Sequence, residues 1–243
     1  DDYSREDVDA YAMESQHRAT RARDSGWFDQ SVCPVEDETG MPILERDDFI
    51  KPDTNMEVLG SLSASFEVIG AMGFDAMALS RYPEVAKIEH VHTPGNSSGI
   101  VDGASAVLVG SEGAGKDLGL EPRGRVVGTA VLATDPVIML TGPAPAARKC
   151  LARAGLDQED IDLWEINEAF ASVPLHYMRE LNIDHEITNV NGGAIAMGHP
   201  LGATGGCLVS IVLDELERRA LHRAMISLCV GGGMGISTII ERC

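Results

Sequence analysis

The sequence predicts a layered α/β fold built on a mixed sheet. After residue 98, short apolar runs that favour strands alternate with longer runs that have helical spacing. The last two strand-like runs are separated only by Gly231-Gly232-Gly233. This linker is too short for a parallel crossover, so the two strands should be antiparallel neighbours. A hydrophobic content of 44% and a charged content of 23% are typical of a chain that buries a core.

Helices are predicted first along the chain. Ser4-Arg5-Glu6-Asp7 has the pattern of a capping box, and apolar residues keep helical spacing to about Asp24. After a turn-rich segment, Thr54-Asn55-Met56-Glu57 begins a second helix. The apolar face of this helix would consist of Leu59, Leu62 and Phe66. Residues 72–92 have an ambiguous pattern.

Strands and helices then alternate. The expected strands cover residues 105–109, 125–133, 161–166, 187–190, 224–230 and 235–241. The expected helices cover residues 145–154, 168–181 and 201–220.

The charge balance excludes one class of function. With 19 Lys+Arg against 38 Asp+Glu, the formal net charge is −19, so no excess of cations is present to neutralise nucleic-acid phosphates. The longest stretch without charged side chains, residues 192–213, is rich in glycine and contains His199 and Pro200, which makes a poor lipid-facing helix. We therefore expect no nucleic-acid partner and no membrane span.

The cysteines indicate a reducing environment. They are Cys33, Cys150, Cys207, Cys229 and Cys243. An odd count without C-x-x-C spacing predicts neither a disulfide framework nor a zinc site, so we expect no metal and a cytoplasmic location. The sequence opens without a signal-peptide pattern and without Met, which favours a processed product or a fragment.

Residues 110–117 differ by one position from a phosphate-binding P-loop. Asp117 stands where Ser or Thr would hold Mg²⁺ and would place an anion beside the phosphates. A P-loop nucleotide hydrolase is thus disfavoured relative to a solvated helix or loop.

Three segments could support catalysis. His199 lies among glycines just before a predicted long helix, whose N-terminal dipole would favour a neutral imidazole that acts as a general base. Cys229 ends an apolar strand before glycines whose N–H groups could form an oxyanion site. Asn167, at a strand-to-helix junction, could donate to an oxyanion. Each pattern also fits a structural role, as a loop-capping histidine, a buried cysteine and an N-cap asparagine.

Together these segments resemble the thiolase family of coenzyme A-dependent acyltransferases. The matching motifs are Asn167-Glu168-Ala169-Phe170, Asn191-Gly192-Gly193-Ala194, Gly198-His199-Pro200-Leu201-Gly202 and Cys229-Val230-Gly231-Gly232-Gly233-Met234-Gly235. The resemblance implies a thiolase-like α-β-α fold. Residues 1–97 would be a loop region that covers coenzyme A, residues 98–120 the end of the N-terminal half-domain, and residues 121–243 the C-terminal half-domain.

The resemblance also implies residue roles. His199 would activate a nucleophilic cysteine, and Cys229 would transfer a proton at the α-carbon of acetyl-CoA. Asn167 would hold a water that, with His199, stabilises the thioester enolate, while the N–H of Gly231 would stabilise the other oxyanion. The residues that would contact the substrate are Ser98, which faces pantetheine, and Met139 and Phe170, which shape the acyl pocket.

The implied reaction makes or cleaves the C–C bond of a 3-ketoacyl-CoA, as in β-oxidation of fatty acids. Coenzyme A and acyl-CoA would be substrates, and no cofactor would be bound permanently. The family resemblance suggests a homodimer or homotetramer, with a hydratase/dehydrogenase subunit as an optional partner. The alternative is a non-catalytic thiolase-like protein or subunit that binds acyl-CoA or lipid. The pair of His199 and Cys229 favours the enzyme, because binding alone needs neither.

The sequence departs from the family in two respects. None of its cysteines matches the motif of the family's nucleophile, so we expect the C-terminal portion of a thiolase that is inactive alone. Residues 67–92 look like an insertion relative to common members. Arg18, Arg21 and Arg23 could offset the acidic surface near coenzyme A, or simply form a solvated helix face.

Overall fold

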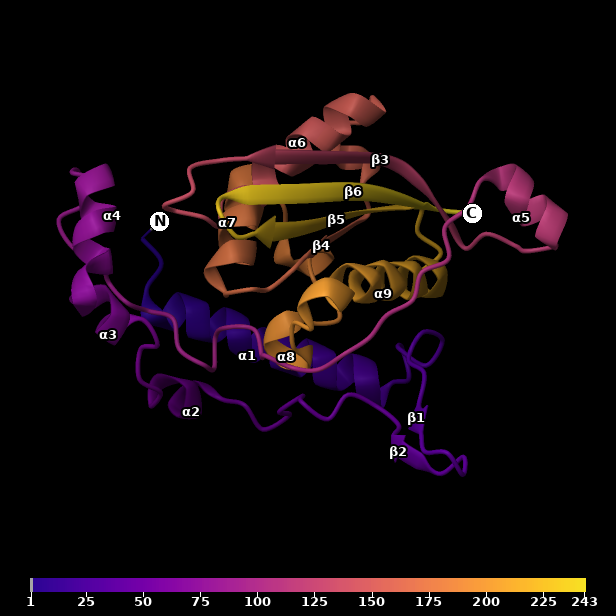
Figure 1. Ribbon diagram of the computed structural model, residues 1–243, viewed down its shortest axis with the longest axis horizontal. Coiled ribbons are helices and arrows are strands. Elements are labelled where there is room, and N and C mark those ends of the chain that lie inside the picture. Colours follow the sequence, from indigo (N-terminus) through magenta and orange to yellow (C-terminus); the bar gives the residue numbers. More distant parts are fainter. Residues whose placement is uncertain (1) are drawn as a thin grey trace.

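The centre of the structure is a four-stranded mixed sheet. The computed structural model describes residues 2–243. The strands lie in the order β3 (Gly124–Ala133), β6 (Met234–Arg242), β5 (Arg223–Val230) and β4 (Leu163–Ile166) (Figure 1). β4 and β5 are parallel, whereas β6 is antiparallel to both β5 and β3. The predicted mixed sheet and the antiparallel final pair are confirmed.

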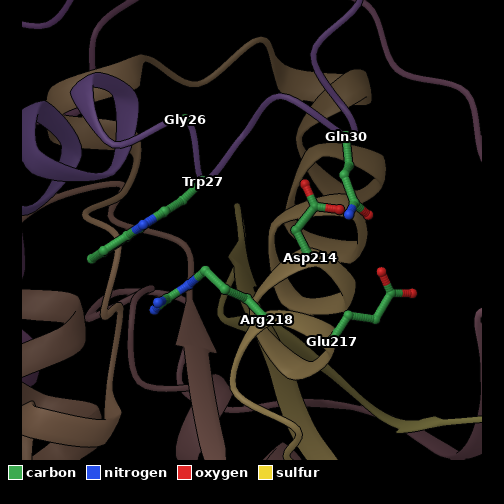
Figure 2. Close-up of a pocket in the computed structure, with 6 residues that line it drawn as sticks. All are labelled: Gly26, Trp27, Gln30, Asp214, Glu217 and Arg218. Atoms are coloured by element: carbon green, nitrogen blue, oxygen red, sulfur yellow. The ribbon is translucent and has the colours of Figure 1, made fainter.

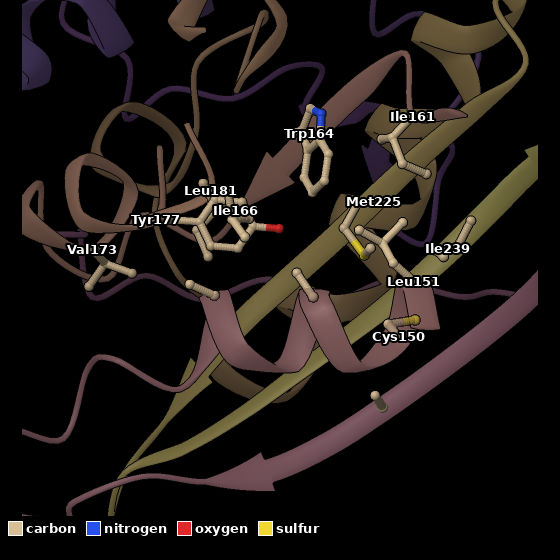
Figure 3. Close-up of a cluster of buried hydrophobic side chains, with 13 residues drawn as sticks. Cys150, Leu151, Ile161, Trp164, Ile166, Val173, Tyr177, Leu181, Met225 and Ile239 are labelled. Atoms are coloured by element: carbon tan, nitrogen blue, oxygen red, sulfur yellow. The ribbon is translucent and has the colours of Figure 1, made fainter. Parts of the chain in front are cut away.

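One face of the sheet packs against α6 (Pro143–Ala154) and α7 (Ser172–Leu181). Trp164 and Ile166 of β4 both point to this face, because side chains alternate along a strand. Trp164 meets Tyr177 of α7 edge-on, with ring centroids 6.0 Å apart. Other members of this cluster, drawn in Figure 3, are Cys150, Leu151, Ile161, Val173, Leu181, Met225 and Ile239.

The opposite face of the sheet is covered by α9 (Thr204–Arg218). Leu163 of β4 and Ile226 of β5 point to this side. The helix contributes Leu208, Val212 and Leu216. The result is the layered helix–sheet–helix arrangement that the sequence predicts.

α1 (Arg5–Asp24) begins with the predicted capping box. The hydroxyl of Ser4 accepts from the N–H of Asp7, and the Asp7 carboxylate accepts from the N–H of Ser4 at 2.8 Å. The helix contacts α2 (Met56–Gly60) and α8 (Ala194–Met197). The buried side chains at these contacts are Val8, Tyr11, Ala12, Leu59, Ala171 and Ile195.

The connecting segments contain the remaining short elements. A hairpin of β1 and β2 forms in the region predicted as turns. α4 forms within the ambiguous region, η1 overlaps its start, and α3 precedes it. Their bounds are β1 (Val35–Glu36), β2 (Pro42–Leu44), α3 (Glu67–Ile69), the π-helical turn η1 (Gly70–Phe74), α4 (Asp75–Arg81), α5 (Glu112–Leu118), η2 (Gln158–Asp160), η3 (His185–Ile187) and η4 (Leu201–Ala203).

Two of the expected strands are wrong. Residues 105–109 pair with no strand within residues 2–243, and Leu108 and Val109 are 84% and 75% exposed. Apolar, β-branched residues favour a strand, but the strand forms only beside a neighbour. Residues 187–190 follow η3 and contribute to the sheet only an isolated bridge from Thr188 to Trp164.

Three expected helices have other bounds. α2 ends at Gly60, so Phe66 is not part of it. α7 begins at Ser172, four residues after the expected start, because the Glu168 side chain is held in buried hydrogen bonds to other segments. α9 begins at Thr204, after the 3₁₀ turn η4.

Candidate active site

Asn167, His199 and Cys229 come from three segments that approach the edge of the sheet where β4 and β5 end. Asn167 follows β4, and its N–H donates to the carbonyl of Ser227 on β5 at 2.9 Å. Cys229 lies two residues farther along β5. Parallel strands end at the same edge of a sheet, as β4 and β5 do here (Figure 1). Asn167 directly follows β4 and Cys229 lies near the end of β5, so both residues lie at this edge. His199 arrives from the segment after α8.

His199 and Asn167 face each other. The Nε2 atom of His199 lies 3.4 Å from Nδ2 of Asn167, and its Nδ1 atom lies 2.6 Å from Oγ1 of Thr204. An amide nitrogen only donates, so Nε2 carries the lone pair and Nδ1–H donates to Thr204. Burial lowers the pKa of His199. The imidazole is thus a neutral base whose lone pair points toward Asn167.

Two backbone features fix the position of His199, namely the conformation of Gly198 and a hydrogen bond of the His199 N–H. Gly198 has φ +89°, and a Cβ atom there would overlap the side chain of Val101. The N–H of His199 donates to the carbonyl of Gly99 at 2.8 Å. Thr204, which fixes the tautomer, had no role in the sequence analysis. Its position at the start of a helix, five residues after the histidine, was the available signal.

Cys229 lies beside the point where the backbone of β6 contacts the backbone at the start of α6. It pairs across the sheet with Gly235 of β6, where a Cβ atom would overlap the carbonyl of Gly142 at the start of α6. Burial raises the pKa of Cys229 to about 11, so the thiol is protonated at neutral pH. Gly231 follows in the exposed turn between β5 and β6, as the sequence predicts.

Asn167 offers an acceptor as well as a donor. The residue is buried, and its Oδ1 atom has no hydrogen-bond partner among the described residues. Buried carbonyl oxygens almost always accept a hydrogen bond, so this atom is suited to a small donor such as water.

Ser98 and Phe170, two of the predicted substrate residues, lie side by side, whereas Met139 lies on a different loop. The N–H of Ser98 donates to the carbonyl of Ala169 at 3.0 Å, which places Ser98 beside Phe170. Phe170 contacts the ring of His92, with centroids 5.0 Å apart, and the ring of Phe66 at 5.7 Å. Met139 lies on a separate loop between β3 and α6, at φ +61°. No role was predicted for His92 from the sequence. Its position just before the loop of residues 93–99 is the only sequence feature that could have indicated one.

A buried carboxylate ties α1 to both catalytic segments. Glu168 accepts from the hydroxyls of Tyr11 at 2.8 Å and Ser15 at 2.6 Å. It also accepts from the side chain of Asn189 at 3.0 Å and from the N–H of Ile195 in α8 at 3.1 Å. Glu168 directly follows Asn167, and α8 leads to His199, so this network fixes the distance between the two residues.

Other predicted features do not gather at this site. Arg18 cannot compensate the coenzyme's charge, because its side chain is buried and donates to the carbonyls of His185 and Thr188. In the P-loop-like segment, Lys116 forms an ion pair with Glu112 on an exposed short helix. No three metal-ligating side chains cluster in the described part of the chain, and within residues 2–243 no helix is long and apolar enough to cross a membrane.

A surface cavity of about 460 Å³ lies elsewhere, between the segment after α1 and the end of α9. Figure 2 shows the guanidinium of Arg218 near the indole of Trp27, and its Cζ atom lies 3.8 Å from the ring centroid. None of the predicted site residues lines this cavity.

Comparison with known proteins identifies the family and the fold. The family description "Thiolase, C-terminal domain" matches residues 120–242, and "Thiolase, N-terminal domain" matches residues 2–73. The chain therefore belongs to the thiolase family.

Several characterised relatives are similar over nearly the whole chain. A mitochondrial 3-ketoacyl-CoA thiolase of Bos taurus is 43% identical over 98% of this chain and 55% of the relative. An acetyl-CoA acetyltransferase of Shinella zoogloeoides is 38% identical over 98% of this chain and 56% of the relative. The chain thus spans about half the length of the relatives it matches.

Solved structures agree with the sequence comparison. The acetyl-CoA acetyltransferase of Bacillus anthracis superposes with a TM-score of 0.84 at 36% identity, covering 99% of this chain and 56% of that one. Human mitochondrial 3-ketoacyl-CoA thiolase in complex with CoA superposes with a TM-score of 0.81 at 36% identity, covering 99% and 55%.

Proposed function

We propose that this chain forms the proton-transfer half of a thiolase, which makes or cleaves the C–C bond of a 3-ketoacyl-CoA. The observation that carries the proposal is the neutral His199 facing Asn167 at the sheet edge that also bears Cys229. Membership of the thiolase family supports it, as does the CoA complex of a structural neighbour. Coenzyme A and acyl-CoA are the substrates, and no cofactor is bound permanently.

Each residue has a distinct task in the proposed reaction. The thiolate of Cys229 removes a proton from the α-carbon of acetyl-CoA, which leaves a thiol and a thioester enolate. A water that donates one hydrogen to Oδ1 of Asn167 can donate its other hydrogen to the enolate oxygen. The N–H of Gly231 donates a hydrogen bond to the second oxyanion. The lone pair on Nε2 of His199 accepts the proton of the nucleophilic thiol.

The nucleophilic thiol itself is proposed to come from outside these 243 residues. Cys33 is exposed just before β1, and Cys243 is exposed just after β6. Cys150 is a residue of α6 and is buried in the hydrophobic cluster between this helix and the sheet. Cys207 lies on α9, where burial and the carboxylate of Asp47 raise the pKa of its thiol, and like the other four cysteines it does not match the motif of the family's nucleophile. We therefore infer that this chain does not catalyse thiolysis by itself.

The setting of the enzyme follows from the same proposal. We infer a homodimer or homotetramer, with or without a hydratase/dehydrogenase subunit. We also infer a cytoplasmic location. Support for a reducing location comes from the five free cysteines in the described residues.

Deuterium exchange tests the proposal with the chain as it is. Enolate formation needs Cys229 but no second cysteine, so the chain should exchange the methyl protons of acetyl-CoA in D₂O. Proton NMR would follow the loss of the methyl signal, and excess coenzyme A should inhibit it by competition. Cleavage of acetoacetyl-CoA should be absent under the same conditions.

Each alternative gives a different result in this experiment. Binding of acetyl-CoA without exchange would support the non-catalytic thiolase-like protein and contradict the proposal. Rapid cleavage of acetoacetyl-CoA by the isolated chain would show that a cysteine within it is the nucleophile.

The pH dependence of exchange follows from the pKa of Cys229. Because burial raises this pKa to about 11, the reactive thiolate is a small fraction at neutral pH. At pH values below the pKa of a thiol, the fraction present as thiolate rises about tenfold for each unit of pH increase. We therefore expect the exchange rate to rise about tenfold per unit between pH 7 and 9. A rate that stays constant over this interval would contradict Cys229 as the base.

A further inference from the structure

An exposed apolar segment adjoins the candidate active site. Residues 66–82, here called the apolar excursion, comprise α3, η1 and α4. Met72 and Phe74 are 76% and 60% exposed, and Val68 and Met77 are also mostly exposed. Apolar side chains concentrated in this way on a surface mark a binding site more often than an ordinary solvated face.

Both ends of the apolar excursion are attached to residues of the proposed acyl pocket. At its start, the ring of Phe66 packs edge-on against Phe170, with centroids 5.7 Å apart. At its end, Arg81 forms an ion pair of 2.9 Å with Asp135, whose carbonyl accepts from the N–H of Met139 at 3.1 Å. The excursion therefore spans from Phe170 to the loop that carries Met139.

Of the three charged side chains in the excursion, Glu67 is exposed and the other two are paired. Asp75 pairs with His90 at 2.9 Å, and Arg81 pairs with Asp135. The excursion bends at Gly73, where φ is +113°. In Figure 1, α3 and α4 lie at the same end of the molecule as the tip of β5. The exposed side chains of the excursion are predominantly apolar and include Val68, Ile69, Met72, Phe74 and Met77.

We infer that the apolar excursion binds the hydrocarbon part of an acyl-CoA and selects acyl groups longer than acetyl. This inference rests on the proposed thiolase function. A coenzyme A moiety is polar and anionic, so only the acyl chain matches an apolar surface that continues from Phe170 and Met139. Flexible methionine side chains can adapt to an extended chain.

Isothermal titration calorimetry of the full chain with octanoyl-CoA and acetyl-CoA tests this inference. Each buried methylene tightens binding about fourfold, so a few methylenes on the excursion should make octanoyl-CoA at least about tenfold tighter. The double substitution Met72→Ser and Phe74→Ser should remove this preference and leave the affinity for acetyl-CoA within about twofold. The matched control is Met41→Ser with Ile43→Ser, two exposed apolar residues of the β1–β2 hairpin region, which should keep the preference.

The outcomes separate the inference from the function on which it rests. Equal affinity for the two acyl-CoA molecules would overturn the acyl-selecting role and leave the proposed function intact. Failure to bind either molecule would overturn the proposed function. A dimer in sedimentation that the double substitution dissociates would show that a second copy of the chain covers the excursion, and would also overturn the inference.

Discussion

Substituting Cys229 with Ser is expected to lower the rate of acetyl-CoA methyl exchange by about 10²–10⁴-fold. The serine hydroxyl has nearly the same shape, but it ionises far less readily than the thiol, whose pKa is about 11 in the fold. The base is therefore lost while the packing of residue 229 beside β6 is retained. The exchange rate from NMR and the midpoint of urea unfolding should be measured on the same samples.

The exposed Cys33 provides the control for this substitution. Cys33→Ser changes the same functional group in the segment before β1, where the side chain has no contact with the site. It should leave exchange unchanged. Full activity in Cys229→Ser, or equal losses in both variants, would refute the assignment of Cys229 as the proton-transfer group.

Replacing Glu168 with Ala is expected to lower the free energy of unfolding by about 3–5 kcal/mol. The fully buried carboxylate accepts from Tyr11, Ser15, Asn189 and the N–H of Ile195. Removing it leaves several buried donors without partners and a cavity, and each effect is costly. Urea denaturation followed by far-UV circular dichroism would measure the change.

Glu165 is a matched control at almost the same depth. Its side chain is also buried, but Oε1 has no hydrogen-bond partner among the described residues, and burial raises its pKa well above the usual value. Burial thus favours the neutral carboxyl, and Glu165→Gln replaces it with an uncharged group of equal size. We expect a change below about 1 kcal/mol. A loss as large as that of Glu168→Ala would show that burial alone, and not the hydrogen-bond network, explains the effect.

The sequence prediction of the candidate site depends on short motifs. Cys229 and Asn167 could be found because their neighbours have characteristic types and because the strands before them have a clear apolar pattern. The β3 prediction is correct within one residue, because residues 125–133 are rich in Val and Thr, which favour a strand.

The parts that could not be predicted depend on contacts between distant segments. The partnership of Glu168 with Tyr11 and Ser15 joins residues more than 150 positions apart. The tautomer of His199 depends on how η4 directs Thr204 back toward the imidazole. The strand expected at residues 105–109 is wrong for a related reason. The local sequence favours an extended backbone, but no neighbouring strand is present in the described residues to pair with it.

The unpaired run at residues 105–109 has a consequence for the folding and handling of this chain. Its sequence, Ser-Ala-Val-Leu-Val, contains neither charge nor proline, and its backbone N–H and C=O groups have no strand partner in the described structure. Such an edge pairs with whichever strand reaches it first, including the same run in another copy. Aggregation of this chain should therefore increase steeply with concentration, and any strand that normally covers the run must arrive before a second copy does.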